Sequence, residues 1–457
     1  MLVVEDAGNP GGSAHVSGSM TRQMLKQAGR IAGVTTLALV PVLAVQVGLG
    51  SLLAARPELA WGVALAFVGL VLVLTVPSLF LVAALPAMYL SMRVGPASTD
   101  ISLADVALAV AAVVAIPSVP WRSPRLQSIL KLLAVYLLVL AIAVVAVPSQ
   151  RAVIEWGHRA FLVAGGLFVG AAVVATGRVR DALRAYLLAS TVVAVAAIVF
   201  AGTHPGSGLF PQPAYPFGFQ KNTAGLMLGF AIIVLTVGAR RVAVPRSLRV
   251  PCVFLLVLGI LACQARGPAI ALMVVLSVWA IHKWRARITP LILVGGLLLL
   301  ALTYTTINSA FQSDSADSRY NSVNSRVATY DAAISLWQRD PVVGVGLKFW
   351  RNPSLAGQTG FGEPHDLAVS ALGESGLVGL AGLAILLIGT IVLVMRRPSQ
   401  LSWLAVLVVV AKTTASAVDI YWVAGSLTFM WIIVGFACAA DPPEPSEAAG
   451  LELSAAQ

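Results

Sequence analysis

Charged side chains are scarce in this chain: they make up 11% of its 457 residues, whereas 58% of the residues are hydrophobic. Soluble globular domains carry about 25% charged residues, so the composition excludes an ordinary soluble protein. Apolar runs of about 20 residues recur instead, each long enough to cross a hydrocarbon core of about 30 Å. Because the runs are continuous, they do not fit the alternating strands of a transmembrane barrel. The sequence therefore predicts an all-α, polytopic transmembrane protein with about 12 to 14 spans.

Cysteine is also rare, with Cys252, Cys263 and Cys438 as the three examples. Each lies inside an apolar run, where a thiol behaves as a small hydrophobic group. No two of them have the spacing of metal ligands, so the sequence predicts neither a disulfide framework nor a metal site. We expect no cofactor.

The apolar runs divide the chain into five parts. We expect a cytoplasmic N-terminal segment (1–30), transmembrane helices (31–307), a large extracytoplasmic loop (308–364), C-terminal transmembrane helices (365–440) and an acidic cytoplasmic tail (441–457). The spans are predicted at 31–54, 60–76, 78–91, 101–117, 127–147, 153–176, 185–202, 223–238, 250–264, 267–283, 288–307, 367–395, 400–417 and 419–440. The first run is longer than the apolar core of a cleaved signal peptide, which favours an uncleaved span. Pro77 and Pro86 leave open whether residues 60–91 form two spans or one kinked helix.

The basic residues predict the orientation, because short loops rich in Lys and Arg stay in the cytoplasm. They gather in the connections on one side of the predicted layout: Arg22, Lys26, Arg30, Arg122, Arg125, Arg178, Arg180, Arg184, Arg240, Arg241, Arg246, Arg249, Lys283, Arg285, Arg287, Arg396 and Arg397. This distribution places the 308–364 loop outside the cytoplasm. The net charge of +11 is thus a topology signal. A nucleic-acid partner is not expected, because the cations are dispersed and no binding motif accompanies them.

One stretch of the large loop has the pattern of a helix. Residues 325–339 are predicted to be helical, with Asn324 or Ser325 as the cap and Asp340-Pro341 as the stop. A stripe of apolar residues at spacings of 3, 4 and 3 marks one face: Val327, Tyr330, Ile334 and Trp337. Arg326 extends this stripe, where it suits an anionic lipid headgroup. An ordinary snorkelling arginine is the competing interpretation.

Three ionisable residues lie at predicted membrane boundaries. Lys221 and Arg266 open spans at their outer ends, and His365 lies where the large loop re-enters the membrane. Such groups are candidates for function, with interface anchoring as the alternative for each cation and an incidental position as the alternative for the histidine. A neutral imidazole can take a proton from a hydroxyl, with Glu363 or Asp366 to orient it. A metal site at these acids and His365 is the weaker interpretation, because the cluster has one imidazole and no thiolate.

Two further groups of ionisable residues lie in apolar segments. Lys412 and Asp419 are expected to form a structural ion pair. Glu155, His158 and Arg159 lie near the outer end of their predicted span, where they can line a cavity. We assign neither group a catalytic role from the sequence.

At these residues the chain resembles the O-antigen ligase and O-antigen polymerase superfamily. The matching motifs are Ser325-Arg326 with Trp337, the segment Asp340-Pro341-Val342-Val343-Gly344-Val345-Gly346, the pair His365-Asp366, and Glu374-Ser375-Gly376-Leu377-Val378-Gly379. The ligase signature of the family is His, then Asn, Ser or Gln, nine residues, Gly, two residues, and Gly, Thr or Tyr. Its spacing holds here, and Asp366 departs from it.

Two shorter segments extend the resemblance. Gln264-Ala265-Arg266-Gly267 is similar to a Ser/Thr-Arg-Gly turn of the family, and the segment that ends in Asn222 is similar to a glycine-containing one. The family usually carries an Arg upstream of this Asn, whereas this chain has Lys221 there. An ammonium does not reproduce the bidentate contact of a guanidinium with phosphate.

The resemblance implies a metal-independent, inverting glycosyltransferase. Such an enzyme moves a glycan from an undecaprenyl pyrophosphate carrier to an acceptor hydroxyl at the outer face of the cytoplasmic membrane. Arg266, Lys221 and Arg326 are then expected to hold the pyrophosphate, and His365 to activate or orient the acceptor hydroxyl. The residues expected to support them are Asp366, Glu363, Glu374 and Asn222. The expected partners are the lipid-linked glycan donor, a glycan or glycolipid acceptor and membrane lipids; ligase and polymerase both stay open.

A transporter or a lipid-linked glycan flippase is the alternative from another class, because these proteins also have many spans. Transporters tend to carry paired broken helices in equivalent positions of two halves and short external loops. The one long loop of this chain is asymmetric and has no second copy. The sequence therefore favours the glycosyltransferase.

Overall fold

The computed structural model describes residues 75–93, 101–204, 212–238, 242, 244–284, 322–351 and 362–440. The chain divides into two units, Met1–Val76 and Pro77–Gln457, and every helix named below lies in the second. Several predicted segments lie outside the described residues: the termini 1–30 and 441–457, the span 31–54, most of the span 60–76, and the span 288–307.

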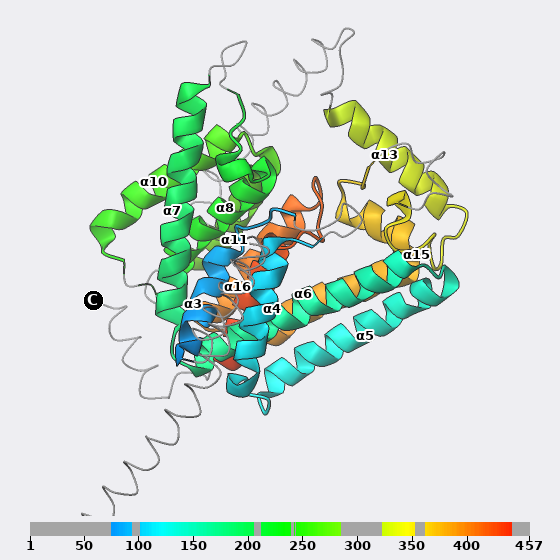
Figure 1. The fold of residues 1–457 in the computed structure, drawn as a ribbon, viewed down its shortest axis with the longest axis horizontal. Helices are drawn as coiled ribbons and strands as arrows, with labels where there is room; N and C mark the ends of the chain where they lie inside the picture. Colours follow the sequence, from blue (N-terminus) through cyan, green and yellow to red (C-terminus); the bar gives the residue numbers. More distant parts are fainter. Residues whose placement is uncertain are drawn as a thin grey trace, which may run out of the picture. The chain divides into compact units, whose positions relative to one another are not determined.

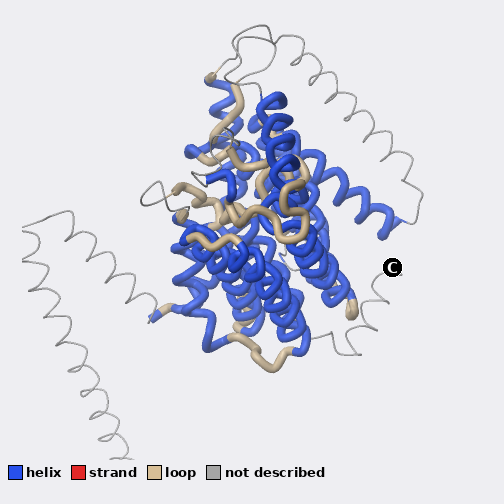
Figure 2. The backbone as a smooth tube through the Cα atoms, turned by 90° about the vertical axis from the view of Figure 1, so that its right-hand side faces the viewer, coloured by secondary structure: helices blue, strands red, loops and turns tan. Residues whose placement is uncertain are grey.

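Helices make up the described part of the chain, which contains twelve α-helices and no strand (Figures 1 and 2). In chain order they are α3 (Pro77–Ala87), α4 (Leu103–Ala115), α5 (Pro124–Ala146), α6 (Gln150–Ala175), α7 (Val179–Thr203), α8 (Lys221–Val237), α10 (Arg246–Cys263), α11 (Arg266–Trp284), α13 (Ser322–Trp337), α15 (Leu367–Met395), α16 (Gln400–Ala415) and α17 (Ser426–Ala439). Three short 3-10 turns accompany them: η1 (Ile116–Ser118), η2 (Pro216–Gly218) and η3 (Phe349–Arg351).

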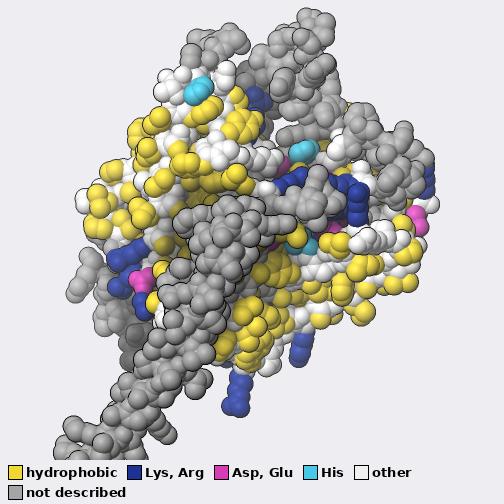
Figure 3. All heavy atoms as spheres, in the orientation of Figure 1, with side chains coloured by type: hydrophobic (Ala, Val, Ile, Leu, Met, Phe, Trp, Pro, Cys, Tyr) yellow, Lys and Arg dark blue, Asp and Glu magenta, His cyan; other side chains and the backbone are white. Residues whose placement is uncertain are grey.

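Four helices, α5, α6, α7 and α15, are long and apolar enough to cross a membrane, and several shorter apolar helices accompany them. Large aliphatic side chains lie on their outer surfaces, for example Leu138 (70% exposed) and Val145 (78%). Hydrophobic side chains accordingly cover much of the visible surface of the described helices (Figure 3). Such a surface suits lipid rather than water. The all-α, membrane-spanning class predicted from the sequence is confirmed, whereas the count of 12 to 14 spans stays a prediction.

Serine residues set where several helices begin. Ser102 and Asp105 form a capping box at α4, with 2.7 Å from the Ser102 amide to the Asp105 carboxylate. Ser123 and Ser149 accept hydrogen bonds from amides in the first turns of α5 and α6. Those helices consequently begin three residues before the predicted spans, at 124 and 150 instead of 127 and 153, because a helix starts at its cap and not at the first apolar residue.

Glycines allow α6 and α17 to pack closely. A Cβ added to Gly170 would lie 2.0 Å from the carbonyl oxygen of Ile432, and one added to Gly435 would lie 2.5 Å from that of Leu167. Small residues four apart, such as Gly166 and Gly170, are typical of close helix contacts in membranes. This packing fixes α17, and with it the connection before α17, against α6.

The two ends of the helix bundle differ. At one end, called the distal end here, side chains bridge the start of α5 to the ends of α17 and α15. Ser123 and Arg125 donate to carbonyls of Cys438 and Ala437 at 2.8 and 3.2 Å, and Arg125 also donates to the Arg397 carbonyl at 3.5 Å. Gln400 joins the start of α16 to the end of α8 there. The opposite end, called the site end, holds the start of α15, the end of α16 and the residues 416–425 that connect α16 to α17.

Candidate functional site

His365 and Asp419 form a hydrogen-bonded pair at the site end, with 3.2 Å between the imidazole Nδ1 and the carboxylate Oδ1. The histidine side chain is 31% exposed and the aspartate 15%. With the proton on Nδ1 donated to Asp419, the lone pair of Nε2 is available to a hydroxyl. This is the arrangement in which a carboxylate orients a histidine general base.

Three contacts fix the backbone around His365. The Tyr330 hydroxyl of α13 donates to the His365 carbonyl at 2.8 Å, and the Leu367 amide donates to the Ser416 carbonyl at 2.8 Å. Asp366 caps α15, accepting from the Val369 amide at 2.8 Å. The sequence offered Asp366 or Glu363 as the residue that orients the ring, and the structure gives that position to Asp419 instead.

Asp419 is held as firmly as the histidine. Its Oδ1 also accepts from the Ile420 amide at 2.8 Å, and the Lys412 ammonium donates to the Ile420 carbonyl at 3.2 Å. Burial alone would raise the pKa of the Asp419 carboxyl, but the hydrogen bonds from His365 and Ile420 and the charge of Lys412 outweigh it and hold the pKa below its usual range. The expected direct ion pair of Lys412 with Asp419 is thus replaced by a contact through the Ile420 peptide.

The helix predicted in the large loop exists as α13, but it begins at Ser322 and so includes the proposed caps Asn324 and Ser325. Its buried residues are Thr329, Ala333 and Leu336, one position away from the predicted stripe. Val327 of that stripe is 51% exposed. The face differs because α13 packs on α15, Phe349 and Trp350, partners that periodicity does not reveal. The side chain of Arg326 lies outside the described part; its backbone belongs to α13, one turn before Tyr330.

The segment 341–346 interlocks with a break in α15. The break is at Gly376, whose φ of 63° and ψ of −162° no helix contains, and a Cβ there would lie 2.3 Å from the Val342 carbonyl oxygen. Backbone groups freed by the break are paired across the interface: Val345 with Gly373, Gly346 with Glu374, Leu377 with Pro341, and Val378 with Val342, at 2.9 to 3.2 Å. The two glycine-containing motifs therefore build one structural unit in the first half of α15.

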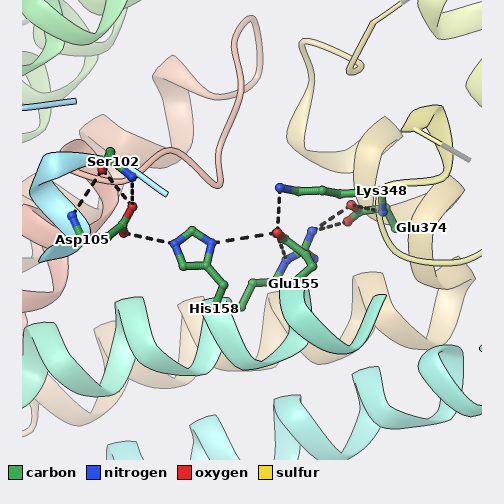
Figure 4. Close-up of polar contacts among 7 residues, drawn as sticks. Ser102, Asp105, Glu155, His158, Lys348 and Glu374 are labelled. Carbon is green, nitrogen blue, oxygen red and sulfur yellow. Dashed lines mark hydrogen bonds and ion pairs between the residues drawn. The ribbon is translucent and has the colours of Figure 1, made fainter. Parts of the chain in front are cut away.

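A buried ionic network lies behind this unit (Figure 4). Its centre is Arg159 of α6, which donates to both oxygens of Glu374 at 2.7 and 2.8 Å and to Glu155 at 2.9 Å. These three residues are 1% to 3% exposed. Lys348 joins its ammonium to Glu155 at 2.8 Å and its amide to Glu374 at 3.1 Å. The network thereby ties the loop at Lys348 to both α6 and α15.

The network also extends toward α4 and toward the His365–Asp419 pair. His158 contacts Glu155 at 3.9 Å and Asp105 of the α4 capping box at 3.0 Å. On the other side, the Arg159 guanidinium lies over the ring of Trp422, 4.5 Å from its centroid. Trp422 belongs to the same connection as Asp419, so the network and the His365–Asp419 pair both contact this connection. Of the charged residues in this network, Glu374 was among the predicted site residues, whereas Asp105, Glu155, Arg159 and Lys348 were not.

Glu363 interacts electrostatically both with the network and with Lys412. Burial and the nearby negative charge of Glu374 raise the pKa of its carboxyl to about 8. The charges of Lys348 and Lys412 both act on it. Glu363 is therefore largely a neutral acid near pH 7.

The predicted cations Lys221 and Arg266 are the first residues of α8 and α11. Their helix ends meet, because a Cβ added to Gly225 would lie 2.4 Å from that of Ala265. The start of α11 also meets the segment before Asp419, since a Cβ on Gly267 would lie 2.8 Å from Val418. The fold thus brings the segments of Lys221, Arg266, His365 and Asp419 to one place. Arg266 is exposed there and Lys221 half-buried.

Arg159 and Asp419 were not predicted as site residues, and the sequence indicates them to different degrees. Arg159 was visible as a cation in an apolar run, and such residues face partners inside a bundle. Asp419 lies 54 positions after His365, and only the packing of α16 and α17 brings it close. Among the described residues no group of three His, Cys, Asp or Glu side chains is arranged to hold a metal ion.

In a comparison with known proteins, residues 251–384 match the family model described as O-antigen ligase. No curated protein matches the chain. The matched range contains most of α10, all of α11 and α13, His365 and the break in α15. It supports a glycosyltransferase-like function in O-antigen or polysaccharide assembly. The match confirms the resemblance that the motifs indicated, and it supports the assignment of this membrane protein to the O-antigen ligase and polymerase superfamily.

Proposed function

We propose that the protein transfers a glycan from an undecaprenyl pyrophosphate carrier to an acceptor hydroxyl at the outer face of the cytoplasmic membrane, as a ligase or a polymerase. The acceptor oxygen forms a bond to the anomeric carbon while the bond from that carbon to the pyrophosphate oxygen breaks. The bonding electrons leave with the pyrophosphate, which stays on the lipid carrier. A single displacement of this kind inverts the anomeric configuration.

The observation that carries this proposal is the His365–Asp419 pair. Asp419 accepts from Nδ1, so Nε2 takes the proton of the acceptor hydroxyl as the new bond forms. Asp419 then stabilises the imidazolium, as the aspartate does in serine hydrolases. The exposure of the His365 side chain gives an acceptor access to that nitrogen.

The leaving pyrophosphate gains negative charge as the glycosidic bond breaks, and cations placed where that charge develops lower the barrier. Arg266 and Lys221 suit this role, because they begin α11 and α8, and helix N-termini favour anions. Arg326 is proposed as the third cation. The reaction needs no metal ion in this proposal, since the guanidinium and ammonium groups supply the positive charge.

Purified protein incubated with lipid-linked oligosaccharide and candidate acceptors tests the function. We expect a glycosylated acceptor with inverted anomeric configuration, detected by NMR, and a rate that EDTA leaves unchanged. Movement of the lipid-linked glycan between the leaflets of a vesicle, without transfer to any acceptor, would instead support the flippase alternative.

A further inference from the structure

A pocket lies where the turn between α5 and α6 meets the segment 345–351. It is lined by Val147, Ser149 and Arg151 on one side and by residues 345–349 and Arg351 on the other. Its volume of about 70 Å³ is several times the roughly 10 to 15 Å³ that one water molecule needs, so a group of the size of a phosphate fits. The pocket shares Lys348 with the ionic network, and it shares no described lining residue with the His365–Asp419 pair.

The lining of this pocket is positively charged. Its described residues include three cations, Arg151, Lys348 and Arg351, and no acid. Lys348 pairs with Glu155 at 2.8 Å, whereas Arg151 donates to a carbonyl, that of Arg351. A guanidinium carries five donors in a fork that matches a phosphate group. Cations in so small a space repel one another, and an anion bound between them replaces this repulsion by attraction.

An exposed aliphatic surface adjoins the pocket. Val145 of α5, two residues before the lining residue Val147, is 78% exposed, and Ile154 of α6, three residues after Arg151, is 56% exposed. Figure 3 shows Lys and Arg side chains gathered above the hydrophobic surface of α5 and α6. An anionic phospholipid fits both features, because its headgroup suits the cations and its acyl chains suit the aliphatic surface. A free anion or an acidic sugar would use the cations alone.

We propose that this pocket binds the headgroup of an anionic phospholipid, with Arg151 and Arg351 on its phosphate and the acyl chains along α5 and α6. The inference does not depend on the proposed transfer reaction. A headgroup bound there joins the start of α6 to the segment 345–351. Phe349 of this segment packs with Ala333 and Leu336 of α13, the helix that contacts the His365 backbone. The lipid therefore stabilises the part of the fold on which α13 rests.

Native mass spectrometry of the purified full-length protein, titrated with phosphatidylglycerol or phosphatidylcholine in detergent, tests the site without turnover. We expect tighter binding of phosphatidylglycerol. Arg151→Gln and Arg351→Gln should each weaken it about tenfold, the loss expected for a charge-assisted hydrogen bond, and Arg151→Lys should weaken it less. Arg339→Gln is the matched control, because it removes the same charge from an exposed residue that does not line the pocket. Arg151→Gln and Arg351→Gln proteins that bind phosphatidylglycerol like the parent would overturn the proposal.

Thermal unfolding and competition identify the ligand. Phosphatidylglycerol should raise the melting temperature of the parent and of Arg339→Gln more than that of Arg151→Gln, because a ligand of the folded state stabilises it. Inorganic phosphate and glucuronic acid, at the concentration of the lipid, should not displace phosphatidylglycerol, since neither reaches the aliphatic surface. Displacement by glucuronic acid would indicate a site for an acidic glycan. Displacement by undecaprenyl pyrophosphate would place the donor in this pocket, and either result would contradict the phospholipid assignment.

Discussion

Asp419 determines which nitrogen of His365 carries a proton. Its carboxylate accepts from Nδ1 at 3.2 Å, which leaves Nε2 as the acceptor, and the Ile420 amide and Lys412 hold the carboxylate in place. Asp366 is closer in sequence, but its oxygen is committed to the first turn of α15. The two aspartates therefore have different roles that substitution can separate.

Asp419→Asn should reduce kcat by about 10² to 10⁴-fold, because an amide neither fixes the Nδ1–H tautomer nor stabilises the imidazolium. Asp366→Asn should change kcat by less than about threefold, since asparagine caps a helix as well as aspartate does. Steady-state kinetics with a saturating donor measures both. Equal losses in the two variants would contradict the separate roles.

Glu363 should give the enzyme an alkaline limit. The pKa of about 8 means that the carboxyl is neutral below this pH and becomes an anion above it. A new negative charge within reach of Lys412 repels an anionic donor, so the donor KM should rise above about pH 8. Glu363→Gln stays neutral and should lose this rise, while its KM at pH 7 stays close to that of the parent. The donor KM of the parent and of Glu363→Gln, measured from pH 6.5 to 9.5, tests this prediction. The same rise of KM in the two proteins would exclude Glu363 as its cause.

The sequence predicts the existence of most helices, but not the residues at which some of them begin. Apolar runs located α5, α6, α7 and α15 because lipid-facing helices must be apolar along their length. The apolar run at 419–440 predicts one span, but α17 begins at Ser426. Asp419 and Gly425, which has a φ of 87°, belong to the connection before it. Hydropathy does not separate an apolar connection from a helix.

The break in α15 should be intolerant of a side chain. Gly376→Ala adds a Cβ at positive φ, where an L-residue costs about 1 to 2 kcal/mol, and places it 2.3 Å from the Val342 carbonyl oxygen, which adds about 1 to 3 kcal/mol of overpacking. We expect a lower melting temperature in detergent and a strong loss of activity. Gly157→Ala in α6 is the control, because a Cβ there meets no atom within 4 Å. Equal stability of the two variants would show that the interlock contributes little.

Loss of Arg159, the centre of the ionic network, should reduce the stability of the protein more than a neutral substitution of its partner Glu374. Arg159→Met leaves Glu155 and Glu374 buried without their shared cation, and a broken buried pair costs about 3 to 5 kcal/mol. Glu374→Gln keeps hydrogen-bonding atoms in place and leaves Arg159 paired with Glu155, so its loss should be smaller. Thermal unfolding of the two purified variants compares them. A Glu374→Gln protein less stable than Arg159→Met would place the centre of the network elsewhere.

The sequence predicts which polar residues belong to the site, whereas only the fold shows that they lie close together. The motifs at Lys221, Arg266 and His365 were recognisable singly, because polar residues at membrane boundaries stand out against apolar runs. Their convergence depends on contacts between α8, α11 and the connection after α16. Asp419 and Arg159 became parts of the site only through such contacts, which local periodicity does not encode.

The orientation in the membrane is the property on which the proposed outer-face reaction depends. At the distal end, Arg125 and Arg184 donate to backbone carbonyls near the ends of neighbouring helices. The two arginines thus satisfy backbone carbonyls near helix ends. They also contribute to the excess of Lys and Arg that marks the cytoplasmic side of a membrane protein. The site end, with α13 and His365, should then face outward.

Cysteine labelling tests this orientation directly. Ser335→Cys on α13 replaces an exposed residue, and Asp181→Cys at the start of α7 replaces a side chain that is 46% exposed. The described cysteines of the chain itself are buried or half-buried. A membrane-impermeant maleimide should label the first in intact cells and the second only after permeabilisation, with the parent protein as the background. The site end faces outward only if this pattern holds. The reverse pattern would put His365 in the cytoplasm, where a glycan presented at the outer face cannot reach it, and the transfer reaction would have to be assigned to the inner leaflet.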